Sequence, residues 1–167
     1  MIRILAVCLG NICRSPAAAA AIRRAGTDAG LDVEVDSAGT GRYHLGEPPH
    51  PRSVSAGERA GLEVRGTARQ ITQDDFERHD LILAMDRYNY EDLIAMAADD
   101  ASRAKIRLFR SFDPAADGED VPDPYYGDED DYRRMIEIIV PAANGVIRHL
   151  GAGEGPGFAK SHLPPGT

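Results

Sequence analysis

Cysteine is scarce in this sequence, and a long hydrophobic run is missing from it. The 167 residues contain two cysteines, Cys8 and Cys13, too few for a disulfide framework or a four-cysteine zinc site. The apolar run from Ile4 to Leu9 is far shorter than the roughly 20 residues that a membrane-spanning helix needs. With no segment that resembles a signal peptide, the sequence predicts a cytoplasmic protein with reduced thiols and no membrane partner.

Basic residues are also fewer than acidic residues. The chain has 19 basic and 27 acidic residues, a formal net charge of -8, which argues against nucleic acid as a partner. The imbalance is uneven, because residues 111–131 hold nine acids and no base, whereas residues 1–25 hold four arginines and no acid. The five histidines show no metal-ligand spacing, so we expect no metal and no cofactor and assign them no catalytic role. They are His44, His50, His79, His149 and His162.

The length fits one domain. A chain of 167 residues can bury roughly two thirds of its unfolded surface in a single core, so it needs neither disulfides nor metals for stability. Residues 151–167 contain five glycines and three prolines, too little packing material to order themselves. We therefore expect one domain over residues 1–150, a flexible tail over residues 151–167, and a monomer.

Hydrophobic periodicity predicts strands that alternate with helices. Short apolar runs favour strands at residues 2–7, 33–35, 80–85 and 105–109, and helical patterns occupy residues 17–25, 52–60, 72–78, 87–98 and 131–150. Ser15 and Pro16 are typical of the start of the first helix and Gly26 of its end, while Pro141 predicts a kink in the last. This alternation predicts a doubly wound α/β fold with about four parallel strands, helices on both faces and a site at the carboxyl ends of the strands.

The most informative segment is the loop between the first strand and the first helix, Cys8-Leu9-Gly10-Asn11-Ile12-Cys13-Arg14-Ser15. Backbone N–H groups at such a helix N-terminus converge on one anion. Those dipoles and the guanidinium of Arg14 give Cys8 an environment that favours a thiolate nucleophile. The planar fork of Arg14 suits two oxygens of a phosphate, Gly10 permits close backbone approach, and Asn11 tolerates a left-handed conformation.

Two other interpretations of this loop are weaker. A cysteine after a buried strand is more often an ordinary core residue, but the arginine, the Ser-Pro start and the helix together favour a nucleophile. A nucleotide-binding loop requires Gly-x-x-x-x-Gly-Lys-Ser/Thr, and no lysine precedes Lys105. The loop therefore predicts a phosphate site of another kind.

The segment from Val7 to Pro16 resembles the phosphate-binding loop of the low-molecular-weight protein tyrosine phosphatases. Further segments resemble that family in the same order, namely Ser37-Ala38-Gly39-Thr40, Gly46-Glu47-Pro48-Pro49, Ala68-Arg69-Gln70-Ile71, Ala84-Met85-Asp86 and Asp123-Pro124-Tyr125-Tyr126-Gly127. The resemblance covers about residues 2–150. It implies a flavodoxin-like phosphatase domain that needs no metal and works through a phosphocysteine intermediate. The implied substrate is a phosphotyrosine-containing protein or a small aryl phosphate.

The resemblance implies a role for each matching residue. Cys8 attacks phosphorus, Arg14 stabilises the equatorial oxygens, and Ser15 donates its hydroxyl to the Cys8 sulfur. Asp123 matches the general acid that protonates the leaving phenolic oxygen. An Asp-Pro pair is often only a turn, but repulsion from the neighbouring acids favours a protonated carboxyl here. The phosphate-binding residues are Leu9, Gly10, Asn11, Ile12, Cys13 and Ser15, and the cleft walls are Tyr43, Tyr125 and Tyr126.

Three positions around the loop leave alternatives open. Many members of the family carry a loop-supporting histidine where this sequence has Gly66, so we expect Thr67 or water to support Asn11. Asp86 matches an aspartate that supports the loop, and it equally suits a cap for the following helix. Cys13 is either a buried apolar residue or the redox partner of the nucleophile in a disulfide.

Two alternative functions are also compatible with the loop. Arsenate reductases coupled to thioredoxin share the fold but pass oxidation along three cysteines, and this chain has two, which leaves only enzymes recycled by small thiols. A non-catalytic phosphate- or phosphotyrosine-binding module would need the loop but not the acid at Asp123. The presence of that acid favours the phosphatase.

Overall fold

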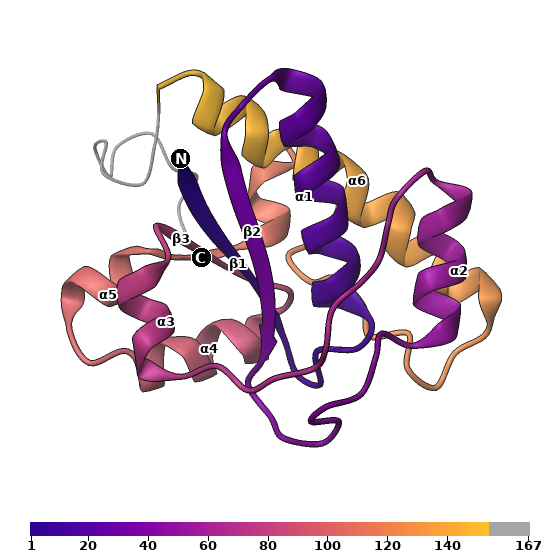
Figure 1. The fold of residues 1–167 in the computed structure, drawn as a ribbon, viewed down its shortest axis with the longest axis horizontal. Helices are drawn as coiled ribbons and strands as arrows, with labels where there is room; N and C mark the ends of the chain where they lie inside the picture. The colour runs from indigo at the N-terminus through magenta and orange to yellow at the C-terminus, as the bar shows by residue number, and fades with distance from the viewer. Residues whose placement is uncertain (154–167) are drawn as a thin grey trace.

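A four-stranded parallel sheet forms the centre of the fold. The computed structural model describes residues 1–153. Its strands are β1 (Ile2–Cys8), β2 (Val33–Gly39), β3 (Leu81–Ala84) and β4 (Ile106–Leu108). They pair in the order β2-β1-β3-β4, and every pair is parallel. Figure 1 shows β2 beside β1. This arrangement confirms the predicted α/β fold with four parallel strands.

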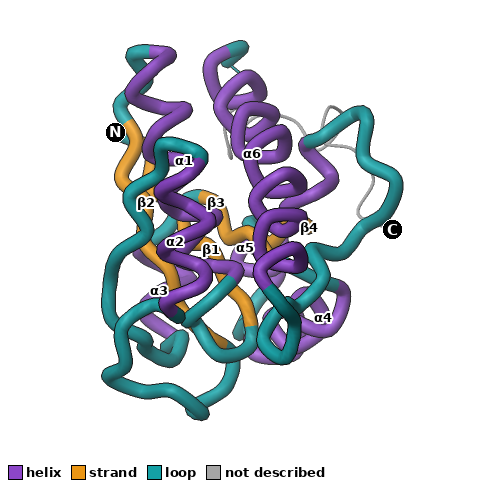
Figure 2. The backbone as a smooth tube through the Cα atoms, turned by 90° about the vertical axis from the view of Figure 1, so that its right-hand side faces the viewer, coloured by secondary structure: helices purple, strands orange, loops and turns teal. Residues whose placement is uncertain are grey.

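Helices cover both faces of this sheet. They are α1 (Arg14–Ala29), α2 (Pro51–Arg59), α3 (Gln73–Arg78), α4 (Arg87–Met96), α5 (Asp100–Ala104) and α6 (Glu129–Gly151), and a short 3-10 helix, η1 (Phe109–Phe112), follows β4. Ile4 and Ala6 of β1 share one hydrophobic cluster with α1 and α6, whereas Leu5 and Val7 share the other with α3 and α4. Figures 1 and 2 show α1 and α6 side by side on the first face. Burial on both faces explains why β1 is an unbroken apolar run from Ile4 to Cys8.

The first helix is longer than predicted, and both predicted ends were wrong. α1 begins at Arg14 with Cys13 as its N-cap residue, because the end of the loop already follows the helical path. Gly26 lies inside the helix and is buried, and a Cβ there would be 2.6 Å from Val33 Cγ2. The glycine therefore allows β2 to pack closely against α1. The helix instead ends before Gly30, whose φ of 65° is typical of a C-cap.

Other differences from the prediction lie at element ends. α6 continues through Pro141 and includes Gly151, so the helix extends one residue into the range 151–167 that was predicted to be the tail. The rest of that tail, residues 154–167, lies outside the described residues. α5 was not predicted because it is a five-residue polar segment with no buried side chain. Within residues 1–153, no helix is long and apolar enough to cross a membrane.

The carboxyl ends of the parallel strands meet at one edge of the sheet, as expected for the site. Cys8 ends β1 directly beside Gly39, the last residue of β2. Met85, just after β3, donates its N–H to the carbonyl of Val7 at 3.0 Å and accepts a hydrogen bond from the N–H of Val121 at 2.8 Å. That last contact brings the 121–127 segment, far away in sequence, to the start of the phosphate loop.

Candidate active site

The loop after β1 wraps around the sulfur of Cys8. The backbone N–H of Asn11 donates to Cys8 Sγ at 3.2 Å, and Ser15 Oγ lies 3.0 Å from the same sulfur. Asn11 has a φ of 57°, the only positive value outside glycine among the described residues, which matches the predicted left-handed turn. These donors surround the sulfur in a way that stabilises negative charge on it.

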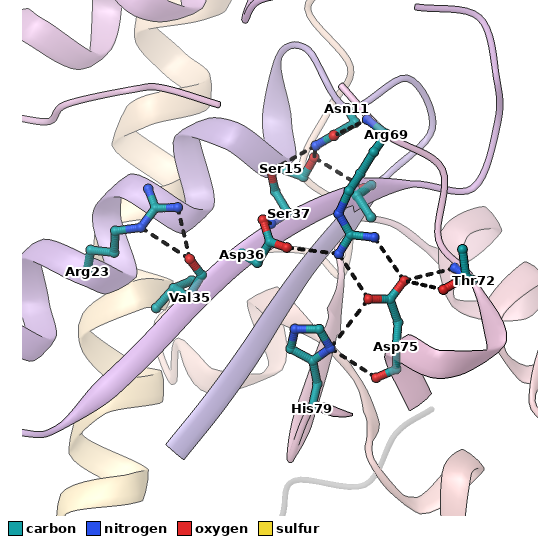
Figure 3. A network of polar contacts seen from close by, with 11 residues as sticks. Asn11, Ser15, Arg23, Val35, Asp36, Ser37, Arg69, Thr72, Asp75 and His79 are labelled. Carbon is teal, nitrogen blue, oxygen red and sulfur yellow. Dashed lines mark hydrogen bonds and ion pairs between the residues drawn. The ribbon is translucent and has the colours of Figure 1, made fainter. Parts of the chain in front are cut away.

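Asn11 is held by side chains and backbone from three separate segments. Its Nδ2 donates to Ser15 Oγ at 2.8 Å and to Ser37 Oγ at 2.9 Å, and its Oδ1 accepts the backbone N–H of Arg69 at 3.0 Å (Figure 3). Thr67, one of the two supports expected from the sequence, is not among these partners. The segment after Gly66 supports Asn11 through a main-chain N–H instead of a histidine ring.

Arg14 is fixed in the floor of the site with its side chain only 3% exposed. Its Nη1 donates to Asp86 Oδ2 at 2.5 Å and to the carbonyl of Val121 at 3.1 Å, while Nη2 lies 3.6 Å from Asp123 Oδ2. Burial opposes the positive charge, but the Cys8 sulfur and the two carboxylates outweigh it and raise the pKa of Arg14. The guanidinium is therefore permanently charged and oriented before a phosphate binds.

Asp86 satisfies both interpretations of its sequence position. One carboxylate oxygen binds Arg14, and the other accepts the N–H of Asn89 at 2.7 Å as the N-cap of α4. The same side chain thus supports the loop arginine and begins a helix.

Asp123 lines the same pocket as the phosphate loop, with 46% of its side chain exposed. Its Oδ1 accepts the N–H of Tyr125 at 3.1 Å. The other acids of this stretch were expected to crowd it, but several have partners of their own. Asp117 pairs with Arg110, and Asp128 and Asp131 form the capping box of α6. Asp123 itself contacts Arg14, whose Nη2 lies 3.6 Å from its Oδ2.

A pocket of about 490 Å³ collects the predicted site residues. Its floor is the loop from Cys8 to Arg14, and its walls include Asp123 and the three predicted tyrosines. Tyr43 and Tyr126 are 74% and 97% exposed, while Tyr125 is half-buried and meets Tyr126 edge to face at 4.8 Å. Ser15 is fully buried and does not line the pocket, although its Oγ lies 3.0 Å from the Cys8 sulfur. Within residues 1–153, no cluster of metal-binding side chains is present.

Sequence reasoning missed His44, which also lines this pocket. Its Nδ1 lies 2.7 Å from Glu47 Oε2, and its ring packs so closely on the loop that a Cβ at Gly10 would be 2.9 Å from His44 Cδ2. Its position beside Tyr43 in the sequence was the one signal that placed it near the cleft.

Cys13 faces a different environment from Cys8, although both are buried and unpaired. Its Sγ lies 3.5 Å from the hydroxyl of Tyr132. Burial raises the pKa of Cys13 to about 11, so this side chain is a neutral thiol near pH 7.

The doubly wound sheet and the anion pocket around a cysteine define the class, a small α/β phosphatase of the cysteine-dependent kind. Residues 3–154 match the family model of the low molecular weight phosphotyrosine protein phosphatases, and the chain belongs to that family. It is 44% identical over 149 residues to a low molecular weight protein-tyrosine-phosphatase of Streptomyces coelicolor, covering 87% of this chain and 91% of the relative. It is 42% identical over 140 residues to the human phosphatase, covering 82% and 88%.

Solved structures agree with the sequence comparison. A crystal structure of a protein tyrosine phosphatase from Entamoeba histolytica, with Hepes in its active site, superposes with a TM-score of 0.89 at 36% identity. The match covers 92% of this chain and 99% of that one. The protein is therefore a cysteine-dependent protein tyrosine phosphatase, and the arsenate reductase and binding-module alternatives are not favoured.

Proposed function

We propose that this enzyme hydrolyses phosphotyrosine in proteins, and small aryl phosphates, with Cys8 as nucleophile and Asp123 as general acid. One observation carries the proposal: Asp123 and Cys8 line the same pocket, and Arg14, which also lines it, is in contact with the acid. A phosphate monoester bound between them has its phosphorus above the sulfur and its leaving oxygen toward the carboxyl group.

In the first step the loop binds the phosphoryl oxygens. The backbone N–H groups and the Arg14 fork hold three equatorial oxygens and stabilise the charge of the flattened transition state. The Cys8 thiolate forms the S–P bond while the P–O bond to the phenol breaks. Asp123 transfers its proton to the departing phenolic oxygen, so the products are phosphocysteine, a neutral phenol and a carboxylate.

In the second step water replaces the sulfur. The Asp123 carboxylate takes a proton from the attacking water, the S–P bond breaks, and inorganic phosphate leaves. Ser15 stabilises the departing thiolate. Because Asn11 donates to Ser15 Oγ, the hydroxyl proton of Ser15 is free to point at the sulfur 3.0 Å away, closer than the 3.5 Å to its other acceptor, the carbonyl of Ala38.

The walls of the pocket support an aryl substrate. Three tyrosines and the His44 ring surround the entrance, and flat aromatic faces pack favourably against a phenyl ring. All of these residues come from one chain, so we infer that the monomer is the working form.

The direct test is turnover of an aryl phosphate in the presence of a chelator, with an arsenate-dependent thiol-oxidation assay run in parallel. Aryl phosphate hydrolysis without metal and without arsenate reduction supports the proposal. A requirement for added metal would overturn the mechanism. Arsenate-dependent thiol oxidation in place of hydrolysis would identify a reductase, and tight phosphate binding with neither activity would identify a binding module.

A further inference from the structure

A network of partly buried polar contacts extends from the phosphate loop to α3. Figure 3 shows Asn11 at one end, Arg69 in the middle and Asp75 at the other. The Arg69 fork donates from both terminal nitrogens to the two oxygens of Asp75, each at 2.9 Å. Nη2 also donates to Asp36 Oδ2 at 2.9 Å. One arginine therefore joins β2, α3 and the loop support.

Asn11 needs external support. Its left-handed φ of 57° is uncommon for a side chain other than glycine and persists where the surroundings enforce it. One of the three hydrogen-bonding partners of its side chain is the backbone N–H of Arg69. The position of the Arg69 N–H therefore influences the position of the Asn11 backbone. The N–H of Asn11 in turn donates to Cys8 Sγ.

The segment that carries this N–H is joined through its backbone to the end of β2 and to residues 46–47. The Arg69 carbonyl accepts the N–H of Gly39 at 2.8 Å, the Ile71 N–H donates to the Gly39 carbonyl at 2.9 Å, and Ala68 forms backbone hydrogen bonds with Gly46 and Glu47. The Arg69 side chain adds the link from this segment to α3. Its partner Asp75 is almost fully buried and also accepts the N–H of Thr72 at 2.8 Å, so the anchor point is itself fixed within α3.

We propose that Arg69 and Asp75 are positioning residues for catalysis: the Arg69–Asp75 ion pair fixes the 68–71 segment so that its backbone holds Asn11, and through Asn11 the phosphate loop, in the reactive conformation. The inference rests on the proposed function of the loop. Neither side chain lines the pocket, so both act on the reaction through Asn11.

The experiment is a double-mutant cycle between Arg69→Met and Asn11→Ala, measured as kcat/KM on an aryl phosphate and as the inhibition constant of inorganic phosphate. Misplacement of a catalytic group by a remote change lowers rates by about 10- to 100-fold, and we expect Arg69→Met to lower kcat/KM by that factor and to weaken phosphate binding. In the Asn11→Ala background the same substitution should cost no more than about threefold, because residues that act through one another are not additive. Arg69→Lys should recover only part of the loss, since an ammonium cannot replace the fork.

The matched control is Arg23→Met. Arg23 is another half-buried arginine, and its guanidinium donates twice to the carbonyl of Val35 in β2 but does not reach Asn11 (Figure 3). This control should leave kcat/KM within about twofold of wild type even where it lowers the melting temperature. All rates are measured at a temperature where circular dichroism shows each variant folded.

If Arg69→Met does not fold, Arg69→Lys and Asp36→Asn replace it in the same cycle, because each weakens the anchor without removing a buried partner from Asp75. The inference would be overturned if the losses in kcat/KM of the two single variants multiply in the double variant. It would also be overturned if an Arg69 variant is folded and as active as wild type. A wild-type enzyme that does not hydrolyse aryl phosphates would instead overturn the proposed function. The two failures are therefore distinguishable.

Discussion

Arg14 and Asp86 form an ion pair in the floor of the phosphate pocket, with 2.5 Å between Nη1 and Oδ2. Both side chains are buried or nearly so, at 3% and 15% exposure. Because the second oxygen of Asp86 caps α4, the orientation of the guanidinium is linked to the start of a helix. The arginine therefore meets a phosphate in an orientation that was fixed during folding.

Asp86→Asn tests this link. Asparagine caps a helix about as well as aspartate, so the variant keeps the cap but loses the charge that holds Arg14. A charge-assisted hydrogen bond contributes about 1.5–3 kcal/mol, and we expect kcat/KM to fall by about 10- to 100-fold. Asp86→Ala should lose about 1 kcal/mol more of unfolding free energy, through the cap.

The control for the cap is Asp99→Ala, which removes the equivalent N-cap of α5 at a position outside the pocket. It should lower the melting temperature and leave kcat/KM unchanged. An Asp86→Asn variant with wild-type kcat/KM would show that Arg14 is oriented without Asp86.

The nucleophile and its arginine are tested by conservative substitutions. Cys8→Ser should abolish turnover yet keep the binding of a phosphate analogue, because the loop survives while the thiolate is lost. Arg14→Lys should also abolish turnover, since the point charge of an ammonium cannot bind two phosphate oxygens as the planar guanidinium does. Steady-state kinetics and calorimetric titration with phosphate measure both effects. Activity of Cys8→Ser within tenfold of wild type would exclude Cys8 as the nucleophile.

Much of the fold was predictable because its signals are local. The unbroken apolar run of β1 and the alanine-rich stretch after Ser15 specify their elements without help from the rest of the chain. The end of α1 was not predictable in this way. Gly26 has the local properties of a helix stop, and only the approach of Val33 explains why it lies inside the helix.

The site also contains some residues that local sequence signals predict and others that depend on contacts between distant segments. Cys8 and Arg14 lie in one contiguous loop, whose spacing between a strand and a helix indicates an anion site. The support of Asn11 by Ser37 and Arg69 joins residues 26 and 58 positions away, and no periodicity in the sequence encodes those contacts. Asp123 was identified only through the family resemblance, because an Asp-Pro pair alone indicates a turn.

The general acid is tested by the leaving group. Asp123→Asn should slow hydrolysis of phenyl phosphate strongly and that of an activated aryl phosphate much less, because a good leaving group needs little protonation. The measurement is kcat for both substrates in the wild type and the variant. Equal losses on the two substrates would remove Asp123 from this role.

The Arg69–Asp75 pair makes a pH-dependent contribution to stability. Burial alone would raise the pKa of Asp75, but hydrogen bonds from Arg69 and from the Thr72 N–H outweigh it and hold that pKa below its usual value. A carboxyl whose pKa is lower in the folded state stabilises the fold fully above its unfolded pKa, about 3.9, and loses that contribution as the pH falls through the folded pKa.

Urea unfolding at a series of pH values measures this effect. The difference in unfolding free energy between wild type and Asp75→Asn should be constant above about pH 5 and shrink below about pH 4. Asp74→Asn is the control, since Asp74 is the exposed neighbour in α3. A difference that does not shrink in acid would mean that the ionised carboxylate of Asp75 does not stabilise the fold.

Cys13 supports a prediction about oxidation. Peroxide converts the Cys8 thiolate to a sulfenic acid, and attack by the Cys13 sulfur forms a disulfide and releases water. We expect reversible inactivation by peroxide, protection by phosphate, and recovery with thiol. Cys13→Ser should keep much of the activity but recover poorly, because nothing then prevents irreversible over-oxidation.

The environment of Cys13 adds a pH dependence to this prediction. Burial raises the pKa of the Cys13 thiol to about 11, and the thiolate is the attacking form, so disulfide formation should accelerate as the pH rises toward that value. The Tyr132 hydroxyl, 3.5 Å from the Cys13 sulfur, acts against this rise in pKa, and Tyr132→Phe should therefore slow disulfide formation at pH 7. Mass spectrometry of the peptide that contains both cysteines measures the loss of two hydrogens. If that loss is not found, or if Cys13→Ser recovers as fully as wild type, Cys13 is only a packing residue.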